Sequence, residues 1–509
     1  MGRNLQFFLI TVTIGLQADK VICQAPDWHW ARMIDQSFFS MSVVATNEGG
    51  CYVGGGEHVI RFNDFGDHLW TIDFSDEVRL FRTADHEHAG FIMQYEEDAM
   101  AAGNSFTAAP GISFVIGFFN TDGSLYDLQN FPALLNVQNL IAIADVHRGP
   151  DGDLLLIGHF SDSLQVADTT LTGYSSSGFL ARFSGVGDLQ WARSLMNTTA
   201  DGFGSNSAVV KQSAAGDVYI NLGSPYPGSS SDTLFAQGGS AFARFSMDGE
   251  LLWSLLTPGG SLAGDEVIFD LRTDGGLFYS ISTLSMTTLI SYFGSLDAEG
   301  QLEWETGDVE DMTVQNVYTG PADNAIFSGS RYGFGQTVVV GGCTLPNEPP
   351  RMFMIEVESD GSCDWLKQSP GQAYGFRGYA VEHPDGIYYT IGNTDGSFIV
   401  LGNDTLTFPP GGSIDYYVAR LGHLPMELGP HTSQRPDLIQ AHPNPFADHL
   451  ILTVPQKMVG LEASLHDPMG RLVSIQQIAS TTQVICLPDH ASGLFLLKCG
   501  GSVLRIVRE

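Results

Sequence analysis

The chain has 509 residues, of which 43% are hydrophobic and 16% are charged, a composition typical of a globular protein with room for more than one domain. Acidic residues outnumber basic ones by 57 to 23, which gives a formal net charge of −34. A polyanion is repelled by nucleic acid and by anionic membrane surfaces, so we expect neither as a partner. We read the acidic excess as a solvated surface. No dense ligand motif accompanies it, so we expect no cofactor and leave Ca²⁺ open as the alternative.

Residues 1–25 have the features of a secretory signal. Arg3 precedes an apolar run over residues 7–16, which is too short to span a bilayer as a mature helix. Cleavage after Ala18 and cleavage after Ala25 both remain open. The residue before Cys23 is not the small residue that a lipoprotein signal has, so we expect a soluble exported protein. No later segment is long and apolar enough to predict a transmembrane helix.

One sequence motif recurs through the next four hundred residues, with a period of about sixty residues. It reads HVIRFNDFGDHLW (58–70), FLARFSGVGDLQW (179–191) and AFARFSMDGELLW (241–253), with looser copies ending at Trp304 and Trp365. In SFVIGFFNTDGSLY, we take Tyr126 to stand at the tryptophan position. Alternating residues predict two strands, and the glycine between them supplies the positive φ of a tight hairpin. The turn glycines are Gly66, Gly123, Gly187, Gly249, Gly300 and Gly361.

A second phrase lies between these hairpins, usually a glycine before an aromatic-rich strand. DGDLLLIG (151–158) and DGIYYTIG (385–392) are examples, and an apolar strand such as SVVAT (42–46) precedes each copy. One unit therefore holds four strands. The last unit has its third strand, DYYVARL (415–421), but no tryptophan strand, and WHWARMI (28–34) supplies the missing element.

We therefore predict an all-β chain whose residues 26–421 form a seven-bladed β-propeller, closed by the N-terminal strand. Tryptophans that recur in nearly every unit are expected to pack between blades. Specific recognition is expected in what does not recur, the long loops between the second and third strands of a blade. The aromatic candidates on that loop face are Tyr174, Tyr226, Tyr332, Phe334 and Phe408.

Catalytic and metal motifs are scarce. DHEHAG places His86 and His88 beside two acids, but a solvated turn explains it better than a metal site, so no metal ligand is assigned. The chain has no GxSxG, HExxH or phosphate-binding loop, and the catalytic residues of any enzyme remain unknown. The few arginines fall mostly at repeat positions, so we expect no carboxylate-binding cluster. Among the cysteines, Cys486 and Cys499 in neighbouring predicted strands are the favoured disulfide pair; small buried hydrophobes are the alternative.

Two resemblances extend this interpretation. The repeat resembles the β-propeller repeats of secreted bacterial surface proteins, and it is similar to the PQQ-type repeat but lacks the Thr-Gly pair and the adjacent cysteines, so no quinone is expected. After a linker at 422–440, PNPF (443–446), GRLV (470–473) and GLFLLK (493–498) resemble the C-terminal sorting domain of type IX secretion substrates in Bacteroidota. That resemblance implies that residues 441–509 form a small Ig-like β-sandwich, engage the type IX secretion machinery, and deliver the chain through the periplasm to the cell surface or the medium.

Two functions follow from these patterns. The first is a non-enzymatic propeller that binds a protein or a glycan through its long-loop face. The alternative is a secreted polysaccharide hydrolase or lyase with acidic residues around the central channel. Free carboxylates with shifted pKa values in the channel would favour the enzyme, and their absence would favour binding.

Overall fold

The computed structural model shows two compact units, residues 1–425 and residues 426–509. All secondary-structure elements among the described residues are β-strands. The predicted signal at 1–25 and nearly all of the predicted linker lie outside the described residues. The residues that the structure describes are 26–34, 41–47, 49–82, 88–136, 139–173, 177–195, 208–222, 241–256, 266–285, 288–307, 309–310, 312–331, 338–345, 351–369, 371–372, 377–383, 386–394, 398–402, 404–407, 415–422, 440–442, 450–454, 459–466, 471–485, 493–499 and 502–508.

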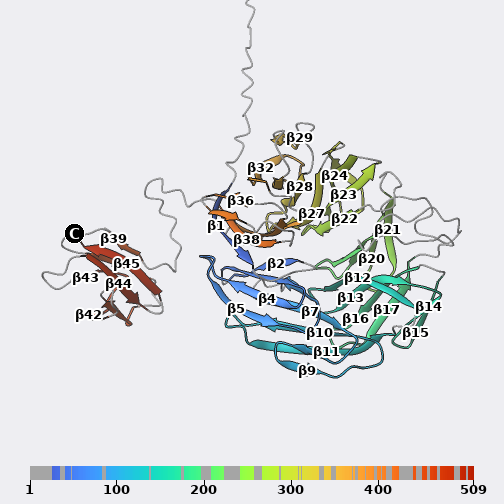
Figure 1. Cartoon of the computed structure of the whole chain (residues 1–509), viewed down its shortest axis with the longest axis horizontal. Helices are drawn as coiled ribbons and strands as arrows, with labels where there is room; N and C mark the ends of the chain where they lie inside the picture. Colours follow the sequence, from blue (N-terminus) through green and yellow to red (C-terminus); the bar gives the residue numbers. More distant parts are fainter. Residues whose placement is uncertain are drawn as a thin grey trace, which may run out of the picture. The chain divides into compact units, whose positions relative to one another are not determined.

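Antiparallel sheets built on the same four-strand pattern make up the first unit, and Figure 1 shows them following one another around a common centre. In each sheet the first strand lies innermost and successive strands pair outward. The strands are, sheet by sheet, β2(Ser42–Ala45), β3(Cys51–Gly55), β4(His58–Phe62), β5(His68–Asp73); β6(Val78–Arg82), β7(Ala89–Tyr95), β10(Ile112–Phe119), β11(Leu125–Leu135); β12(Leu140–Arg148), β13(Leu154–Phe160), β16(Ser177–Phe183), β17(Leu189–Ser194); β18(Val209–Gln212), β19(Val218–Leu222), β20(Ala241–Phe245), β21(Leu251–Leu256); β22(Glu266–Leu271), β23(Leu277–Ser285), β24(Thr288–Leu296), β25(Leu302–Glu305); β27(Met312–Thr319), β28(Ala325–Arg331), β31(Arg351–Val357), β32(Cys363–Gln368); and β34(Arg377–His383), β35(Ile387–Thr394), β38(Asp415–Gly422), β1(Asp27–Ile34).

The N-terminal strand joins the last of these sheets. β1 pairs antiparallel with β38, so that Ala31 lies opposite Ala419. This pairing was predicted from the missing tryptophan strand of the last unit. The innermost strand of the last sheet, β34, contacts β2 of the first sheet, and β2 in turn contacts β6. The chain ends of the first unit are therefore fastened into one sheet, and the arrangement is propeller-like.

The turn glycines have the backbone conformation that the sequence predicted. All six have positive φ, between 77° and 94°. At five of them a side chain is also opposed by a tryptophan ring of the neighbouring sheet, which lies close to where a Cβ would be: Trp30 on Gly66, Trp70 on Gly123, Trp191 on Gly249, Trp253 on Gly300 and Trp304 on Gly361. The indole N–H of each of these tryptophans also donates a hydrogen bond to a carbonyl of that turn. The repeated tryptophans thus join neighbouring sheets.

The assignment of Tyr126 to the tryptophan position was wrong by one residue. Trp191 lies opposite Arg182, and the corresponding partner of Phe118 is Asp127. The ring that packs on the turn glycine at this junction comes from Phe131, whose Cδ1 lies 3.0 Å from the Cβ position of Gly187.

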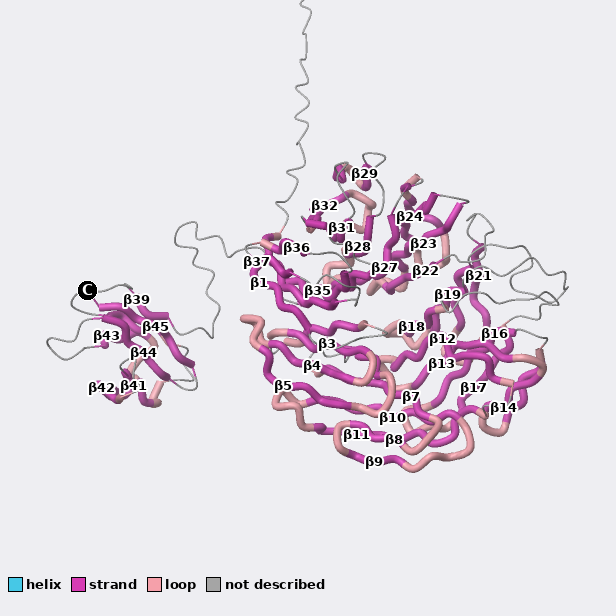
Figure 2. The backbone as a smooth tube through the Cα atoms, viewed as in Figure 1, coloured by secondary structure: helices cyan, strands magenta, loops and turns pink. Residues whose placement is uncertain are grey.

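The long loops between second and third strands form hairpins along the outer edges of the sheets. These are β8(Ala99–Ala101) with β9(Asn104–Phe106), β14(Ser163–Val166) with β15(Thr169–Thr172), β29(Val338–Val340) with β30(Cys343–Leu345), and β36(Phe398–Leu401) with β37(Asp404–Thr407). β14 pairs with β11 of the preceding sheet, and Asp404 accepts the Ala31 N–H of edge strand β1 at 2.8 Å. Much of this loop length therefore protects strand edges. Figure 2 shows β14 at the periphery of the first unit.

One disulfide fastens such a hairpin. Cys343 in β30 is bonded to Cys363 in β32, with the Cα atoms 5.7 Å apart. This pair was not predicted from the sequence. Cys486 lies outside the described residues, so its pairing with Cys499 stays a prediction.

Two antiparallel sheets form the second unit. One contains β39(Gln440–His442), β40(Leu450–Thr453) and β43(Thr482–Ile485); the other contains β42(Leu472–Gln477), β41(Glu462–His466), β44(Gly493–Cys499) and β45(Ser502–Arg508). Buried side chains from both sheets, including Leu452, Leu465 and Ile506, belong to one hydrophobic cluster. This unit therefore has a core of its own.

Candidate functional site

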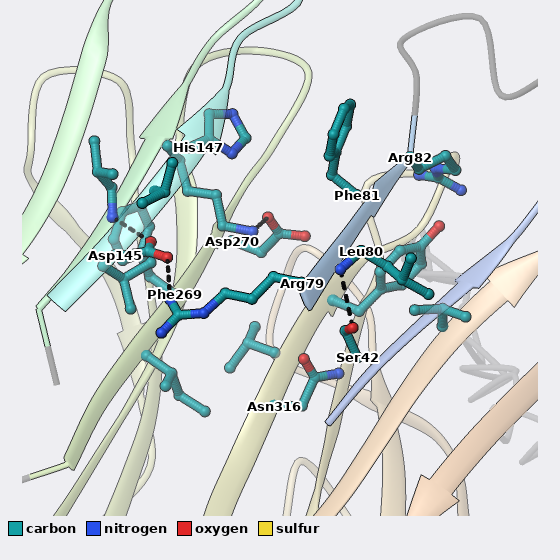
Figure 3. Close-up of a pocket in the computed structure, with 18 of the residues that line it drawn as sticks. Ser42, Arg79, Leu80, Phe81, Arg82, Asp145, His147, Phe269, Asp270 and Asn316 are labelled. Atoms are coloured by element: carbon teal, nitrogen blue, oxygen red, sulfur yellow. Dashed lines mark hydrogen bonds and ion pairs between the residues drawn. The ribbon is translucent and has the colours of Figure 1, made fainter. Parts of the chain in front are cut away.

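The innermost strands of the first unit surround a cavity of about 940 Å³. Residues of β2, β6, β12, β18, β22, β27 and β34 line it, as expected where propeller-like sheets meet. The lining is mixed, with valine, isoleucine and phenylalanine beside ionisable and amide side chains (Figure 3). A concave site of this size with a few convergent polar groups is the usual form of a small-molecule site.

Sheet register sorts the side chains of the inner strands into tiers. In each innermost strand, one residue pairs with the second residue of the neighbouring strand in the same sheet. We call these seven residues the His147 tier. The residues two positions earlier in the innermost strands form the Asp145 tier. Residues two apart point to the same face of a strand. The His147 tier comprises Val44, Phe81, His147, Lys211, Asp270, Tyr318 and Glu382. The Asp145 tier comprises Ser42, Arg79, Asp145, Val209, Ile268, Asn316 and Ala380.

Asp145 is fully engaged by two neighbouring sheets. Its Oδ1 lies 3.4 Å from Nη1 of Arg79, which Figure 3 shows extended towards it from β6. Its Oδ2 accepts the backbone N–H of Val210 from β18 at 3.0 Å. Burial raises the pKa of Asp145 above its ordinary value, and the charge of Arg79 opposes that rise. The carboxylate therefore joins three consecutive sheets.

Asp270, in the His147 tier, links its neighbours in the same way. Nζ of Lys211 lies 3.1 Å from Asp270 Oδ1, and the Thr319 N–H donates to Asp270 Oδ2 at 2.8 Å. Burial alone would lower the pKa of Lys211, but the ion pair and hydrogen bond with Asp270 leave that pKa above its ordinary value. Both acids of the cavity lining thus hold a cation and a backbone N–H.

Uncharged side chains complete the links between inner strands. The Leu80 N–H donates to Ser42 Oγ at 3.0 Å, and Asn316 Nδ2 donates to the Ala380 carbonyl at 2.8 Å. The Tyr318 hydroxyl donates to the Glu382 carbonyl at 3.0 Å. These bonds give the cavity wall a fixed geometry.

Arg82, like Arg148, lies over an aromatic ring. Its guanidinium carbon lies 5.3 Å from the ring centroid of Tyr318, which belongs to a sheet elsewhere around the cavity. No ion pair joins it to a carboxylate of the described residues, but its charge acts on the buried carboxyl group of Glu382 and partly offsets the rise of that group's pKa. Burial and the nearby Lys211 lower the pKa of His147 to about 3, so its imidazole is neutral at physiological pH. The cavity therefore offers two arginines, Arg82 and Arg148, that form no ion pair among the described residues, beside polar groups that carry no charge.

A buried carboxyl pair lies behind the wall. Glu356 and Glu382 are only 6% and 9% exposed, and both interact with Asn324. Tyr388 donates its hydroxyl to Glu356 Oε2 at 2.8 Å. Burial raises the pKa of both carboxyls to about 7. Their side chains do not line the cavity, so the shift reflects packing between sheets rather than access to a substrate.

The aromatic binding candidates, Tyr174, Tyr226, Tyr332, Phe334 and Phe408, all lie outside the described residues, as does His86. His88 lies against Tyr126, with ring centroids 4.6 Å apart. Among the described residues, no group of three or more His, Cys, Asp or Glu side chains is placed to hold a metal ion. Within the same residues, no helix has the length and apolarity to cross a membrane.

That three arginines line one cavity was not predicted from the sequence. Arg79, Arg82 and Arg148 all line the cavity, together with Lys211. The missed signal was positional, because basic residues in VRLFR (78–82), DVHR (145–148) and VVKQ (209–212) occupy the strand that precedes the aromatic phrase. That strand is the innermost one.

No family model matches the chain, and no curated protein sequence matches it significantly. Solved structures similar to it include the polysaccharide lyase Uly1, with 12% identity and a TM-score of 0.39 over 78% of this chain and 92% of that one. A protein of unknown function from Dyadobacter fermentans has 9% identity and a TM-score of 0.37 over 77% and 99%. PorZ, a surface component of the type IX secretion system of Porphyromonas gingivalis, has 11% identity and a TM-score of 0.29 over 94% and 83%. Similarity at this level assigns neither a substrate nor an activity.

Proposed function

We propose that the chain is an exported surface protein in which a seven-bladed β-propeller, residues 26–421, binds a protein or a glycan without chemical turnover. The closure of the last sheet by β1 and the cavity framed by inner strands support the seven-bladed architecture. Propellers present rigid rims and a central cavity, and both are suited to recognition.

The observation that carries a binding role is the state of the two cavity acids. Hydrolysis of a glycosidic bond needs a carboxylic acid and a carboxylate that are open to the substrate. Asp145 and Asp270 instead hold Arg79, Lys211 and two backbone N–H groups. The pair with raised pKa values, Glu356 and Glu382, is buried between sheets. The described residues therefore favour binding over glycoside hydrolysis.

Delivery to the surface is the second element of the proposal. The basic start and apolar run of residues 1–25 support export, and the motifs of residues 441–509 support recognition by the type IX secretion machinery. The second unit has its own core, as a separately recognised Ig-like sorting domain requires.

A glycan array probed with the full chain tests the binding role, with reducing ends and unsaturated products assayed for every glycan that binds. Binding without product supports the proposal, whereas product formation would replace it with the hydrolase or lyase alternative. For delivery, the chain lacking residues 441–509 is compared with the full chain in a Bacteroidota host that has type IX secretion. Equal surface labelling of both forms would contradict the sorting role.

A further inference from the structure

We propose that the region of the cavity around Arg82 binds the carboxylate or sulfate group of a short acidic saccharide. This inference rests on the proposed binding function and specifies its ligand. It is carried by the arrangement of charge in the cavity, by the geometry of Arg82 and by the size of the space.

The charges of the wall oppose those of the whole chain. The chain carries −34 overall, yet four cations and two anions line the cavity: Arg79, Arg82, Arg148 and Lys211 against Asp145 and Asp270. Arg79 and Lys211 are committed to the two acids. Arg148 lies over the Phe118 ring, with its guanidinium carbon 5.6 Å from the centroid. Burial lowers the pKa of Arg148, and the charges of three nearby aspartates oppose that shift. Arg148 therefore lies among several acids, whereas Arg82 has an effect on one acid of the described residues, Glu382, whose raised pKa its charge partly offsets.

Arg82 interacts with the Tyr318 side chain through one hydrogen bond, and its guanidinium has five N–H donors in all. A guanidinium held over an aromatic ring is stabilised through its face, and its N–H groups lie at its edge. Those N–H groups form a planar fork that matches a carboxylate or sulfate in bidentate geometry. Tyr318 is itself fixed by its hydrogen bond to the Glu382 carbonyl, so the platform is rigid. A preorganised cation in a partly enclosed space is an anion site that loses little entropy on binding.

Other groups of the wall fit the remainder of a sugar. Ser42, Gln315 and Asn316 supply hydroxyl and amide groups to the lining, and neutral His147 adds a ring that can donate or accept. A cavity of about 940 Å³ is within the range of sites for drug-sized ligands. A long polyanion would be repelled by the chain's net charge, whereas a short one brings few charges to a local cation. A short acidic saccharide therefore fits best.

Calorimetric titration of the full chain tests this with three probes: trigalacturonate, which carries carboxylates, neocarrabiose 4-sulfate, which carries a sulfate, and maltotriose, which is neutral. We expect at least one acidic probe to bind and maltotriose not to bind. Arg82→Gln should weaken binding at least tenfold, Arg82→Lys should weaken it less, and Arg193→Gln, which removes an exposed arginine of β17, should leave it unchanged. The preferred probe distinguishes a carboxylate ligand from a sulfate ligand.

Unfolding temperatures of the three variants check that each is folded before its affinity is compared. Equal binding by the Arg82→Gln and Arg193→Gln proteins, equal binding of maltotriose, or binding of neither acidic probe would overturn the inference. Array glycans that bind without dependence on Arg82 would leave the proposed function standing and refute this site. Turnover of an acidic probe that is lost with Arg82 would keep the site and refute the non-catalytic role.

Discussion

Trp191 of one sheet lies against Gly249 of the next, with the indole Cδ2 atom 2.7 Å from the position where a Cβ of residue 249 would be. The indole N–H donates to the Met247 carbonyl of the same turn at 2.9 Å. Gly249 has a φ of 77°, so a side chain there is opposed both by backbone strain and by the ring.

We expect Gly249→Ala to destabilise the protein by about 2–4 kcal/mol, as the sum of left-handed strain and overpacking. Gly103→Ala is the matched control, since Gly103 has a φ of 81° but nothing within 4 Å of its Cβ position; strain alone predicts about 1–2 kcal/mol there. Denaturant unfolding measures both. In a Trp191→Ala background the two penalties should become equal, and a persisting difference would show that the ring is not the cause.

The repeated sequence motifs made much of this fold predictable. Alternating strands, glycine turns and the echo between Trp30 and Trp191 predicted the hairpins, their positive φ and the joining of β1 to the last sheet, because these features depend on local sequence and are repeated. Tyr126 was misplaced because this aromatic residue comes one position before the one that corresponds to the tryptophans, as the register of β10 and β11 shows. Only the structure shows that Phe131 packs on the turn glycine instead.

The site was less predictable because it depends on which residues meet across the ring. Arg82 and Tyr318 are far apart in sequence, and no periodicity indicates that their side chains touch. The long loops attracted attention by their variability, yet a disulfide and backbone pairing fasten several of them to strand edges. Length alone does not distinguish an edge cover from a recognition loop.

The link between Lys211 and Asp270 should contribute measurably to stability. Asp270→Ala removes the ion pair and the acceptor of the Thr319 N–H, whereas Asp270→Asn keeps an acceptor. We expect losses of about 1–3 kcal/mol for alanine and about 1 kcal/mol for asparagine, since the pair is only partly buried. Glu77→Gln, at an exposed pair with Arg79, should change stability by less than about 1 kcal/mol. Equal effects of Asp270→Ala and Glu77→Gln would show that the inner link does not stabilise the fold.

Glu382 should make stability fall as the pH rises towards neutrality. Its pKa is about 7 in the folded chain against an ordinary value of 4.5, because of burial. The folded state therefore holds a proton that the unfolded chain has released between these values. The stability that the neutral acid contributes is complete below pH 4.5 and is lost as the pH rises through about 7.

Glu382→Gln keeps a neutral side chain at every pH, so we expect it to stabilise the protein by on the order of 1–3 kcal/mol at pH 8 and to have little effect at pH 4.5. Unfolding free energies measured at several pH values give the difference between variant and parent. Glu299→Gln, at an exposed turn, serves as the control. A constant difference across the range would refute the assignment of a raised pKa to Glu382.

The cysteines provide a test of edge protection. The bond between Cys343 and Cys363 closes a segment with a sequence separation of 20, and a crosslink of that span stabilises by about 3 kcal/mol in the loop-entropy model. Cys51 is fully buried, and burial raises the pKa of its thiol to about 12, so it should not react in the folded state. Iodoacetamide labelling before and after unfolding, followed by peptide mass spectrometry, should recover the 343–363 crosslink and label Cys51 only after unfolding.

A double Cys343→Ser and Cys363→Ser variant should unfold at a lower denaturant concentration and expose the β29–β30 hairpin to proteolysis. The reason is that noncovalent contacts alone, such as the hydrogen bond from the Cys363 N–H to the Gly341 carbonyl, would then hold the hairpin to β32. Unchanged proteolysis of the hairpin would mean that those contacts suffice to cover the strand edge.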